Sequence, residues 1–130
     1  MKLTKKFLRF SIVGVMVLLA ELLVFNFVIN ADATFLLGRV IALIVGLSLS
    51  FTLNRRYTFR AQNREVIKQL PKFIILYVIT IALDIIISVS LNNALPQSNI
   101  YSNIAVVTGI AVSGVINFIG LNNWVFKKKK

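Results

Sequence analysis

Four long apolar segments alternate with short polar ones along the chain. Each apolar segment is close to the roughly 20 residues that an α-helix needs to cross a hydrocarbon core about 30 Å thick. The pattern predicts transmembrane helices over residues 7–29, 35–53, 70–92 and 103–121. We therefore expect an all-α integral membrane protein with four transmembrane helices.

Composition agrees with this class. Hydrophobic residues make up 58% of the 130 residues and the mean hydropathy is +0.84, which is more apolar than a soluble domain of this size. The apolar run over residues 10–29 is too long for the core of a signal peptide, so we expect a retained anchor.

The polar connections differ in character. Residues 54–72 are strongly basic, and Arg60, Arg64 and Lys68 recur there at helical spacing, which predicts a short helix lying on the membrane surface. Pro71 would mark the junction of this helix with the third span. Residues 96–99 combine proline, serine and asparagine and predict a turn.

Lysine and arginine are distributed very unevenly. Fourteen of the fifteen lie in residues 2–9, 54–72 and 127–130, whereas residues 30–34 and 92–102 contain none. Because basic residues flanking membrane helices stay in the cytoplasm, we expect both termini and the central connection to be cytoplasmic. The predicted location is the cytoplasmic membrane, with several membrane passes.

The chain contains a two-helix unit twice. An offset of 63 residues places Glu21 on Asp84, and an offset of 67 places Tyr57 on Trp124. We attribute the difference between the offsets to a second loop that is four residues longer. Repeat one then covers residues 7–59 and repeat two covers 70–126, within one membrane domain over 1–130. Both repeats would cross the bilayer in the same direction, as two parallel repeats.

Small residues recur every fourth position in the second and fourth spans. The two stripes consist of Gly38, Ala42, Gly46 and Ser50, and of Ala105, Gly109, Ser113 and Asn117. A period of four places each stripe on one helix face and allows a neighbouring backbone to approach closely. The stripes therefore predict packing seams, and a substrate groove between them remains an alternative.

Three charged side chains fall inside the predicted spans: Glu21, Arg39 and Asp84. A charge at the bilayer centre costs roughly 2.5–3.5 kcal/mol on insertion scales, so each should face protein or water and have a partner. Arg39 and Glu21 lie on spans joined by a short loop and can approach each other, whereas Asp84 has no basic partner in its own repeat.

Polar residues accompany Asp84 along one face of the third span: Tyr77, Thr80 and Ser88. These groups either hold the bundle together or line a polar cavity. In the second case Arg39 would bind an anion and the acids would accept hydrogen bonds from hydroxyl groups.

The basic segment over residues 54–57 also has two interpretations. Topology and attraction to anionic lipids explain it simply. Alternatively Asn54, Arg55 and Arg56 bind a phosphate-bearing headgroup or a partner enzyme.

Several functional classes are disfavoured. The chain has no cysteine and no histidine, so thiolate sites, the usual metal ligand and the usual general base are absent. We expect no enzyme activity, no cofactor and no metal. Nucleic acid is an unlikely partner chemically, because the basic residues are confined to the ends of the spans.

Three sequence segments resemble the GtrA-like family of small four-span bacterial membrane proteins, which carry a repeated Asn-Phe-x-x-Asn-Arg-x-Trp-x-Phe pattern. The segments are Arg9-Phe10-x-x-Val13-Gly14, Ser50-Phe51-x-x-Asn54-Arg55-x-Tyr57-Thr58-Phe59, and Asn117-Phe118 followed by Trp124-Val125-Phe126. Ser50 and Tyr57 depart from the pattern, and Leu121-Asn122 stands in place of the second Asn-Arg. Arg55 is therefore the one motif arginine that is carried over.

The resemblance implies a role in glycosylating cell-surface polymers such as O-antigen or teichoic acid. The implied activity is flipping of a polyprenyl-phosphate-linked sugar across the membrane, between membrane glycosyltransferases that act before and after it. Arg55 and Arg56 would bind the phosphate at the inner face, and Arg39 would receive it near the outer face. Glu21 and Asp84 would accept sugar hydroxyls or a coupling proton. The other candidate substrate-binding residues are Asn54, Asn117, Tyr77 and Thr80.

Four spans enclose little volume, so we expect a homo-oligomer. One alternative is a non-transporting subunit that stabilises a membrane glycosyltransferase. A small multidrug exporter is disfavoured, because exporters with dual topology need a weak lysine and arginine asymmetry, and this chain has a strong one.

Overall fold

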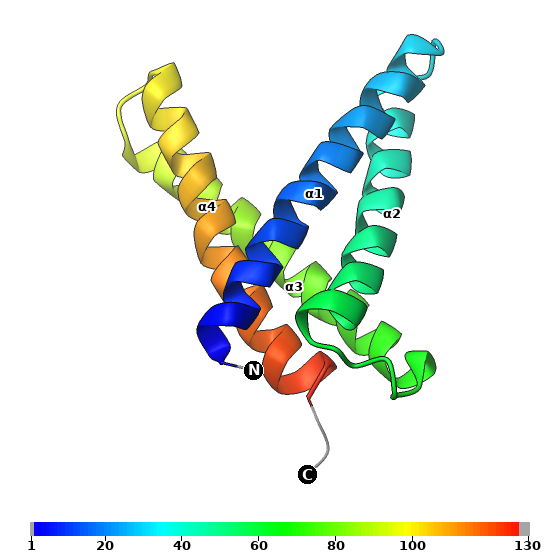
Figure 1. The fold of residues 1–130 in the computed structure, drawn as a ribbon. Helices are drawn as coiled ribbons and strands as arrows, with labels where there is room; N and C mark the ends of the chain where they lie inside the picture. Colours follow the sequence, from blue (N-terminus) through cyan, green and yellow to red (C-terminus); the bar gives the residue numbers. More distant parts are fainter. Residues whose placement is uncertain (1, 128–130) are drawn as a thin grey trace. The chain divides into compact units, whose positions relative to one another are not determined.

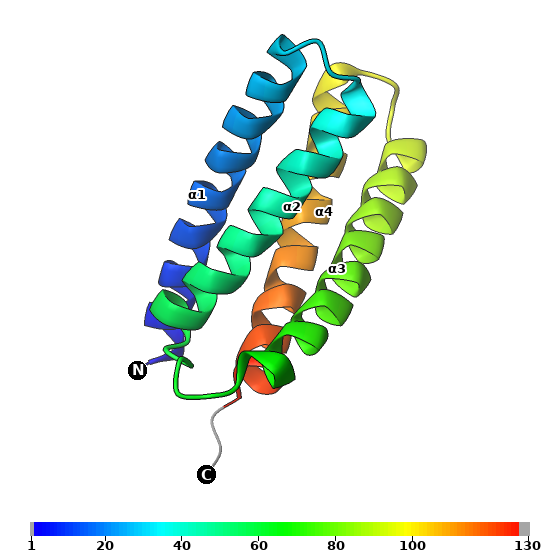
Figure 2. The ribbon, with the colours of Figure 1, turned by 90° about the vertical axis from the view of Figure 1, so that its right-hand side faces the viewer.

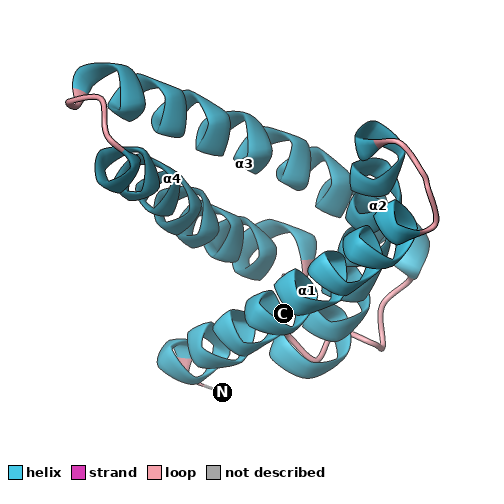
Figure 3. Cartoon of the chain, turned by 90° about the horizontal axis from the view of Figure 1, so that it is seen from above, coloured by secondary structure: helices cyan, strands magenta, loops and turns pink. Residues whose placement is uncertain are grey.

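The computed structural model describes residues 2–127, which are almost entirely helical and contain no strand in that range (Figures 1 and 3). The elements are α1 (Leu3–Asn30), α2 (Phe35–Leu53), the π-helical turn η1 (Asn54–Thr58), α3 (Val66–Ala94), α4 (Asn99–Gly120) and the π-helical turn η2 (Leu121–Val125). Four helices in the described residues are long and apolar enough to cross a membrane. The predicted all-α membrane fold with four spans is confirmed.

Two compact units divide the chain, Met1–Asn63 and Arg64–Lys130. Each unit is an antiparallel helical hairpin. α1 packs along α2 and η1 in the first unit, and α3 packs along α4 and η2 in the second (Figure 2). Each unit contains one of the two predicted repeats.

Short polar loops reverse the chain within each hairpin. Thr34 caps α2 by accepting a hydrogen bond from the Leu37 N–H at 3.2 Å, and Ser98 caps α4 by accepting one from the Tyr101 N–H at 3.3 Å. Asp32 has a left-handed backbone with φ 62°, which an aspartate tolerates better than most residues. The turn predicted over residues 96–99 is confirmed as the connection that leads into α4.

The expected difference in loop length is wrong. Four residues separate α1 from α2, and four also separate α3 from α4. The extra residues lie in the helices: α3 has 29 residues where α1 has 28, and α4 has 22 where α2 has 19. Apolar sequence continues through the inserted positions, so they extend a helix instead of adding to a polar loop.

The expected surface helix in the central connection is also wrong. The chain is not helical between Phe59 and Glu65, and α3 begins at Val66 and runs through Pro71. Arg60 has a left-handed backbone with φ 49°, which is incompatible with a continuing right-handed helix. Pro71 lies in the second turn of α3, where it removes only one backbone hydrogen bond.

The small residues of α2 and α4 occupy buried positions, from Gly38 to Ser50 and from Ala105 to Asn117. A Cβ at Gly38 would lie 3.1–3.3 Å from side-chain atoms of Ile29 and Phe25 on α1. The predicted packing seams are therefore confirmed. Large apolar residues on the remaining helix faces stay exposed, such as Leu23 at 73% and Phe27 at 76%, as expected for helices surrounded by lipid.

Candidate functional site

In the first hairpin, Glu21 packs directly on a glycine of the neighbouring helix. A Cβ at Gly46 would overlap the carboxyl oxygen Oε1 of Glu21 and lie 2.5 Å from its Cγ and Cδ. Gly46 is buried and Glu21 is half-buried. The absence of a side chain on α2 therefore creates the space that the carboxyl group occupies.

Asp84 repeats this arrangement in the second hairpin. A Cβ at Gly109 would overlap Oδ1 of Asp84 and Oγ of Ser88, and would lie 2.9 Å from the backbone oxygen of Asp84. The Ser88 hydroxyl donates a hydrogen bond to Oδ1 of Asp84 at 3.1 Å. Each hairpin therefore holds one carboxyl group in its apolar span, seated on a glycine of the partner helix.

The acid and glycine pairs share an offset of 63 residues, from Glu21 to Asp84 and from Gly46 to Gly109. Sequence comparison at an offset of 67 had matched Gly46 with Ser113 instead. Gly46 lies eight residues before η1, whereas Gly109 lies twelve residues before η2. The additional turn of α4 is therefore inserted between the glycine and the π-helical turn.

Arg39 lies on α2 with an exposed side chain. Its charge acts electrostatically on Glu21, but the two side chains do not form an ion pair within 4.0 Å. The structure thus places Arg39 in the same hairpin as Glu21 without joining the two charges directly.

The polar residues of α3 follow its α4-facing side. Thr80 is buried and donates a hydrogen bond from its hydroxyl to the backbone oxygen of Tyr77 at 3.1 Å. The Ser102 hydroxyl of α4 donates to Oδ1 of Asn92 on α3 at 2.8 Å. Sequence reasoning missed this contact between the two helices, although Asn92 lies on the same helical period as Asp84 and Ser88.

A buried chain of hydrogen bonds links α2 to η1. The Thr58 hydroxyl donates to Oδ1 of Asn54 at 2.9 Å, and Nδ2 of Asn54 donates to Oγ of Ser50 at 3.2 Å. Asn54 and Thr58 are at most 1% exposed. The predicted substrate-binding residue Asn54 therefore has internal partners for both ends of its amide.

Asn117 of the second hairpin contrasts with Asn54. Its side chain is 6% exposed, and its Oδ1 has no hydrogen-bond partner among the described residues. Leu121 follows four residues later, where the equivalent position after Asn54 is Thr58. The missing hydroxyl donor explains why this acceptor is unsatisfied.

Each hairpin also carries a cation against an aromatic ring near its basic end. The Arg9 guanidinium lies 4.8 Å from the centre of the Tyr57 ring and donates from Nη1 to the backbone oxygen of Tyr57 at 3.0 Å. Nζ of Lys72 lies 6.0 Å from the centre of the Trp124 ring. The repeat equivalence of these residues, expected from the sequence, is thus visible as the same kind of contact in both units.

Arg55 and Arg56 have a part in shaping the central connection. Nη2 of Arg55 donates to the backbone oxygen of Gln62 at 3.0 Å, and Nε2 of Gln62 donates to the backbone oxygen of Arg56 at 3.2 Å. The Ala61 N–H donates to the backbone oxygen of Arg55 at 2.7 Å. These bonds hold the loop back against η1.

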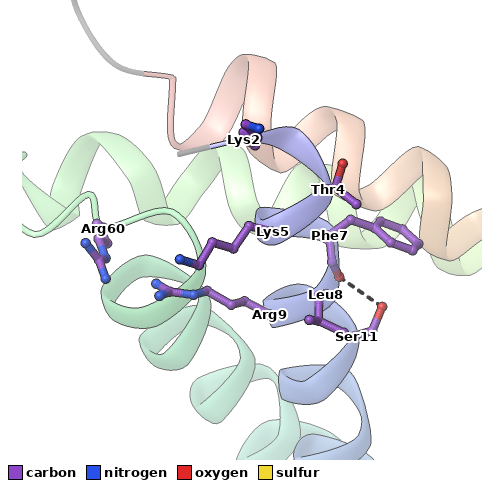
Figure 4. A pocket seen from close by; sticks show the side chains of 8 residues that line it. All are labelled: Lys2, Thr4, Lys5, Phe7, Leu8, Arg9, Ser11 and Arg60. Atoms are coloured by element: carbon purple, nitrogen blue, oxygen red, sulfur yellow. Dashed lines mark hydrogen bonds between the residues drawn. The ribbon is translucent and has the colours of Figure 1, made fainter.

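Basic residues gather at the open end of the first hairpin, opposite the loop between α1 and α2. A hollow of about 870 Å³ there is lined by the start of α1 and by Arg60 (Figure 4). Of the basic block predicted at the C-terminus, Lys127 is described, and residues 128–130 lie outside the described residues.

A comparison with protein families identifies the chain. The family model described as GtrA/DPMS, transmembrane domain, matches residues 9–129. Neither a curated protein nor a solved structure gives a significant match. The family match covers nearly the whole chain, agrees with the four membrane-spanning helices, and points to a function related to glycosylation at a membrane. The chain belongs to the GtrA-like family of multi-pass membrane proteins.

Proposed function

We propose that the protein flips a polyprenyl-phosphate-linked sugar across the cytoplasmic membrane, for glycosylation of a cell-surface polymer. The observation that carries this proposal is that each hairpin keeps one carboxyl group in its apolar span at an equivalent position. A carboxyl group in hydrocarbon is costly, and its presence in both repeats favours a role in handling polar cargo.

Charge and chemistry divide the path of the cargo into stages. Cations at the basic end attract the lipid phosphate in the inner leaflet. Glu21 and Asp84 accept hydrogen bonds from sugar hydroxyls within the span, and Arg39 receives the phosphate towards the other leaflet, since a guanidinium suits phosphate oxygens in a bidentate geometry. The protein supplies a route and no covalent chemistry, so we propose that it is not an enzyme. It acts as a homo-oligomer between membrane glycosyltransferases.

Transport in reconstituted vesicles tests the proposal. A labelled polyprenyl-phosphate sugar is added to one leaflet, and its appearance in the other leaflet is timed. Glu21→Gln and Arg39→Ala should each slow transport by at least about tenfold, because each removes a charge-assisted hydrogen bond.

Asp32→Asn and Lys68→Ala are matched controls, since they change a loop carboxylate and an exposed surface lysine. Both controls should transport at the wild-type rate. Wild-type transport by Glu21→Gln and Arg39→Ala, in protein that is folded normally, would contradict the assigned roles.

A second candidate is a subunit that stabilises a membrane glycosyltransferase without transporting lipid. The observation in its favour is that Glu21 and Asp84 both contact glycines within their own hairpins, as packing residues do. In that case deletion of the gene lowers the amount of the partner enzyme, and vesicles with the purified protein show no lipid movement.

A further inference from the structure

The hollow at the basic end of the first hairpin combines positive charge with apolar surface. Its lining includes four cationic residues, Lys2, Lys5, Arg9 and Arg60, and no acidic residue. Its volume of about 870 Å³ is within the range of small-molecule sites in proteins. All of its lining residues belong to the first unit, so the site is complete within one hairpin.

Three of the cations approach from two different elements. Lys5 and Arg9 lie four residues apart on α1 and extend side by side towards the loop that carries Arg60 (Figure 4). Arg60 reaches this place through its left-handed backbone, with φ 49°. A cluster brought together from a helix and a strained loop position differs from a run of basic residues along one surface.

The start of α1 adds to the positive potential. Lys2 provides no side-chain cap, and the first turn contains no acidic residue. The first N–H groups of a helix carry a partial positive charge and favour an anion. An anionic group beside Lys5 would therefore meet both side-chain cations and the positive end of a 28-residue helix.

Apolar side chains continue from the cations into the membrane span. Phe7 and Leu8 line the hollow and are 42% and 61% exposed. Ile12, Val15 and Leu19 follow Leu8 on the same helix face, and each is more than 40% exposed. A hydrocarbon chain can lie along this face while its headgroup stays among the cations.

The cations available to a ligand here differ from those expected from the sequence. Arg55 is hydrogen-bonded to the Gln62 carbonyl, and neither it nor Arg56 lines the hollow. Arg9 spends one N–H group on Tyr57, and a guanidinium has five. Lys5, Arg9 and Arg60 are thus the cations best placed to receive an anion.

We propose that this pocket binds the phosphate of a lipid phosphate monoester or diphosphate, with Lys5, Arg9 and Arg60 contacting its oxygens and Phe7 and Leu8 contacting the start of its chain. A lining with several cations and no acid favours a headgroup of charge −2 or more over a zwitterionic one, whose amine would have no partner. The inference rests on the proposed function in one respect: a polyprenyl phosphate is the lipid of this class that the transport cycle would use.

Direct binding tests the pocket without transport. The full chain is placed in nanodiscs of phosphatidylcholine, and binding of a fluorescent polyprenyl phosphate is measured. Lys5→Gln and Arg60→Asn should each weaken binding about five- to tenfold, and the double variant about 30-fold or more. Asparagine at position 60 tolerates the left-handed backbone while removing the charge. Added salt should weaken wild-type binding, because the contacts are ionic.

Lys68→Gln is the matched control, since Lys68 is an exposed lysine outside the pocket that pairs with Glu65. It should bind as the wild type does, and circular dichroism should show equal helix content in all variants. A labelled phosphatidic acid distinguishes the source of the phosphate. Weaker binding than the polyprenyl phosphate assigns the prenyl chain, and equal binding assigns lipid phosphate monoesters in general.

Three results would overturn the inference: wild-type affinity in the double variant, an equal loss in Lys68→Gln, or displacement of the probe by inorganic phosphate at the same concentration as the lipid. Failure of the proposed function has a different signature. Wild-type protein that binds the probe but moves no lipid contradicts transport and leaves the pocket in place, whereas a double variant that transports and binds normally contradicts the pocket alone.

Discussion

At the scale of single residues, Gly46 and Gly109 accommodate a carboxyl group in different ways. The atoms facing Gly46 belong to the flexible end of the Glu21 side chain, which can move aside. Gly109 faces the backbone oxygen of Asp84 as well as two side chains, and a backbone atom of a packed helix cannot move independently. The two glycines are equivalent by position in the repeats but differ in what a substitution would displace.

Gly109→Ala should therefore destabilise the protein by about 2–3 kcal/mol, and Gly46→Ala by about 1 kcal/mol or less, because overpacking costs roughly 1–3 kcal/mol and a flexible neighbour relieves part of it. Unfolding in mixed detergent and SDS micelles measures both changes. Glu21→Ala should abolish the cost of Gly46→Ala, whereas Asp84→Ala should leave part of the cost of Gly109→Ala.

Gly14→Ala and Gly114→Ala serve as controls, because a Cβ at either position meets nothing within 4 Å. Both should be neutral or stabilising by about 0.5–1 kcal/mol, which is the helical preference of alanine over glycine. An equal cost at all four glycines would show that the acids are not seated as described.

The candidate residues were identifiable from the sequence because ionisable groups are rare in apolar spans. Glu21, Arg39 and Asp84 are conspicuous for that reason alone. Their partners were not predictable, because a period of four offers several small residues on the same face, and only the packing selects Gly46 and Gly109. The hydrogen bond between Asn92 and Ser102 depends likewise on how α3 and α4 align.

At the scale of elements, the two contacts between a cation and an aromatic ring should contribute unequally to their hairpins. Arg9 makes a hydrogen bond as well as a ring contact with Tyr57, whereas Lys72 makes the longer ring contact with Trp124. Arg9→Ala should cost about 1–2 kcal/mol of stability, and Lys72→Ala less than about 1 kcal/mol.

Fluorescence separates the two contacts, because Trp124 is the single tryptophan of the chain. Lys72→Ala should shift the emission of Trp124, and Arg9→Ala in folded protein should leave it unchanged. An Arg9→Lys variant keeps the charge but loses the guanidinium geometry, so it should recover only part of the stability. Emission that responds equally to Arg9→Ala and Lys72→Ala would contradict the assignment.

The four long helices were predictable because length and apolar content decide whether a segment crosses a membrane. Two features of the elements were not. The π-helical turns over Asn54–Thr58 and Leu121–Val125 depend on hydrogen bonds that apolar periodicity does not report. The connection after η1 has helical charge spacing, but the left-handed backbone of Arg60 and the bonds from Arg55 and Gln62 prevent a helix.

At the scale of the whole molecule, the charge distribution predicts which loops face the cytoplasm. The chain has no cysteine, so single cysteines introduced by substitution report topology without interference. Ala31→Cys and Gln97→Cys should react with a membrane-impermeant thiol reagent on intact cells. Asn63→Cys should react only after the membrane is permeabilised, because residues 54–72 are basic. Labelling of Asn63→Cys in intact cells would reverse the orientation.

The added turn of α4 has a consequence for the surrounding bilayer. The membrane-spanning helix that includes η1 has 22 residues, whereas the one that includes η2 has 27. At 1.5 Å per residue the longer helix exceeds the shorter one by about 7 Å. A bilayer of one thickness cannot match both lengths without tilting a helix or deforming locally, and each ångström of hydrophobic mismatch costs a fraction of a kcal/mol. The two hairpins, although built on one plan, therefore favour membranes of different thickness, so that thinning or thickening the lipid would shift strain from one to the other.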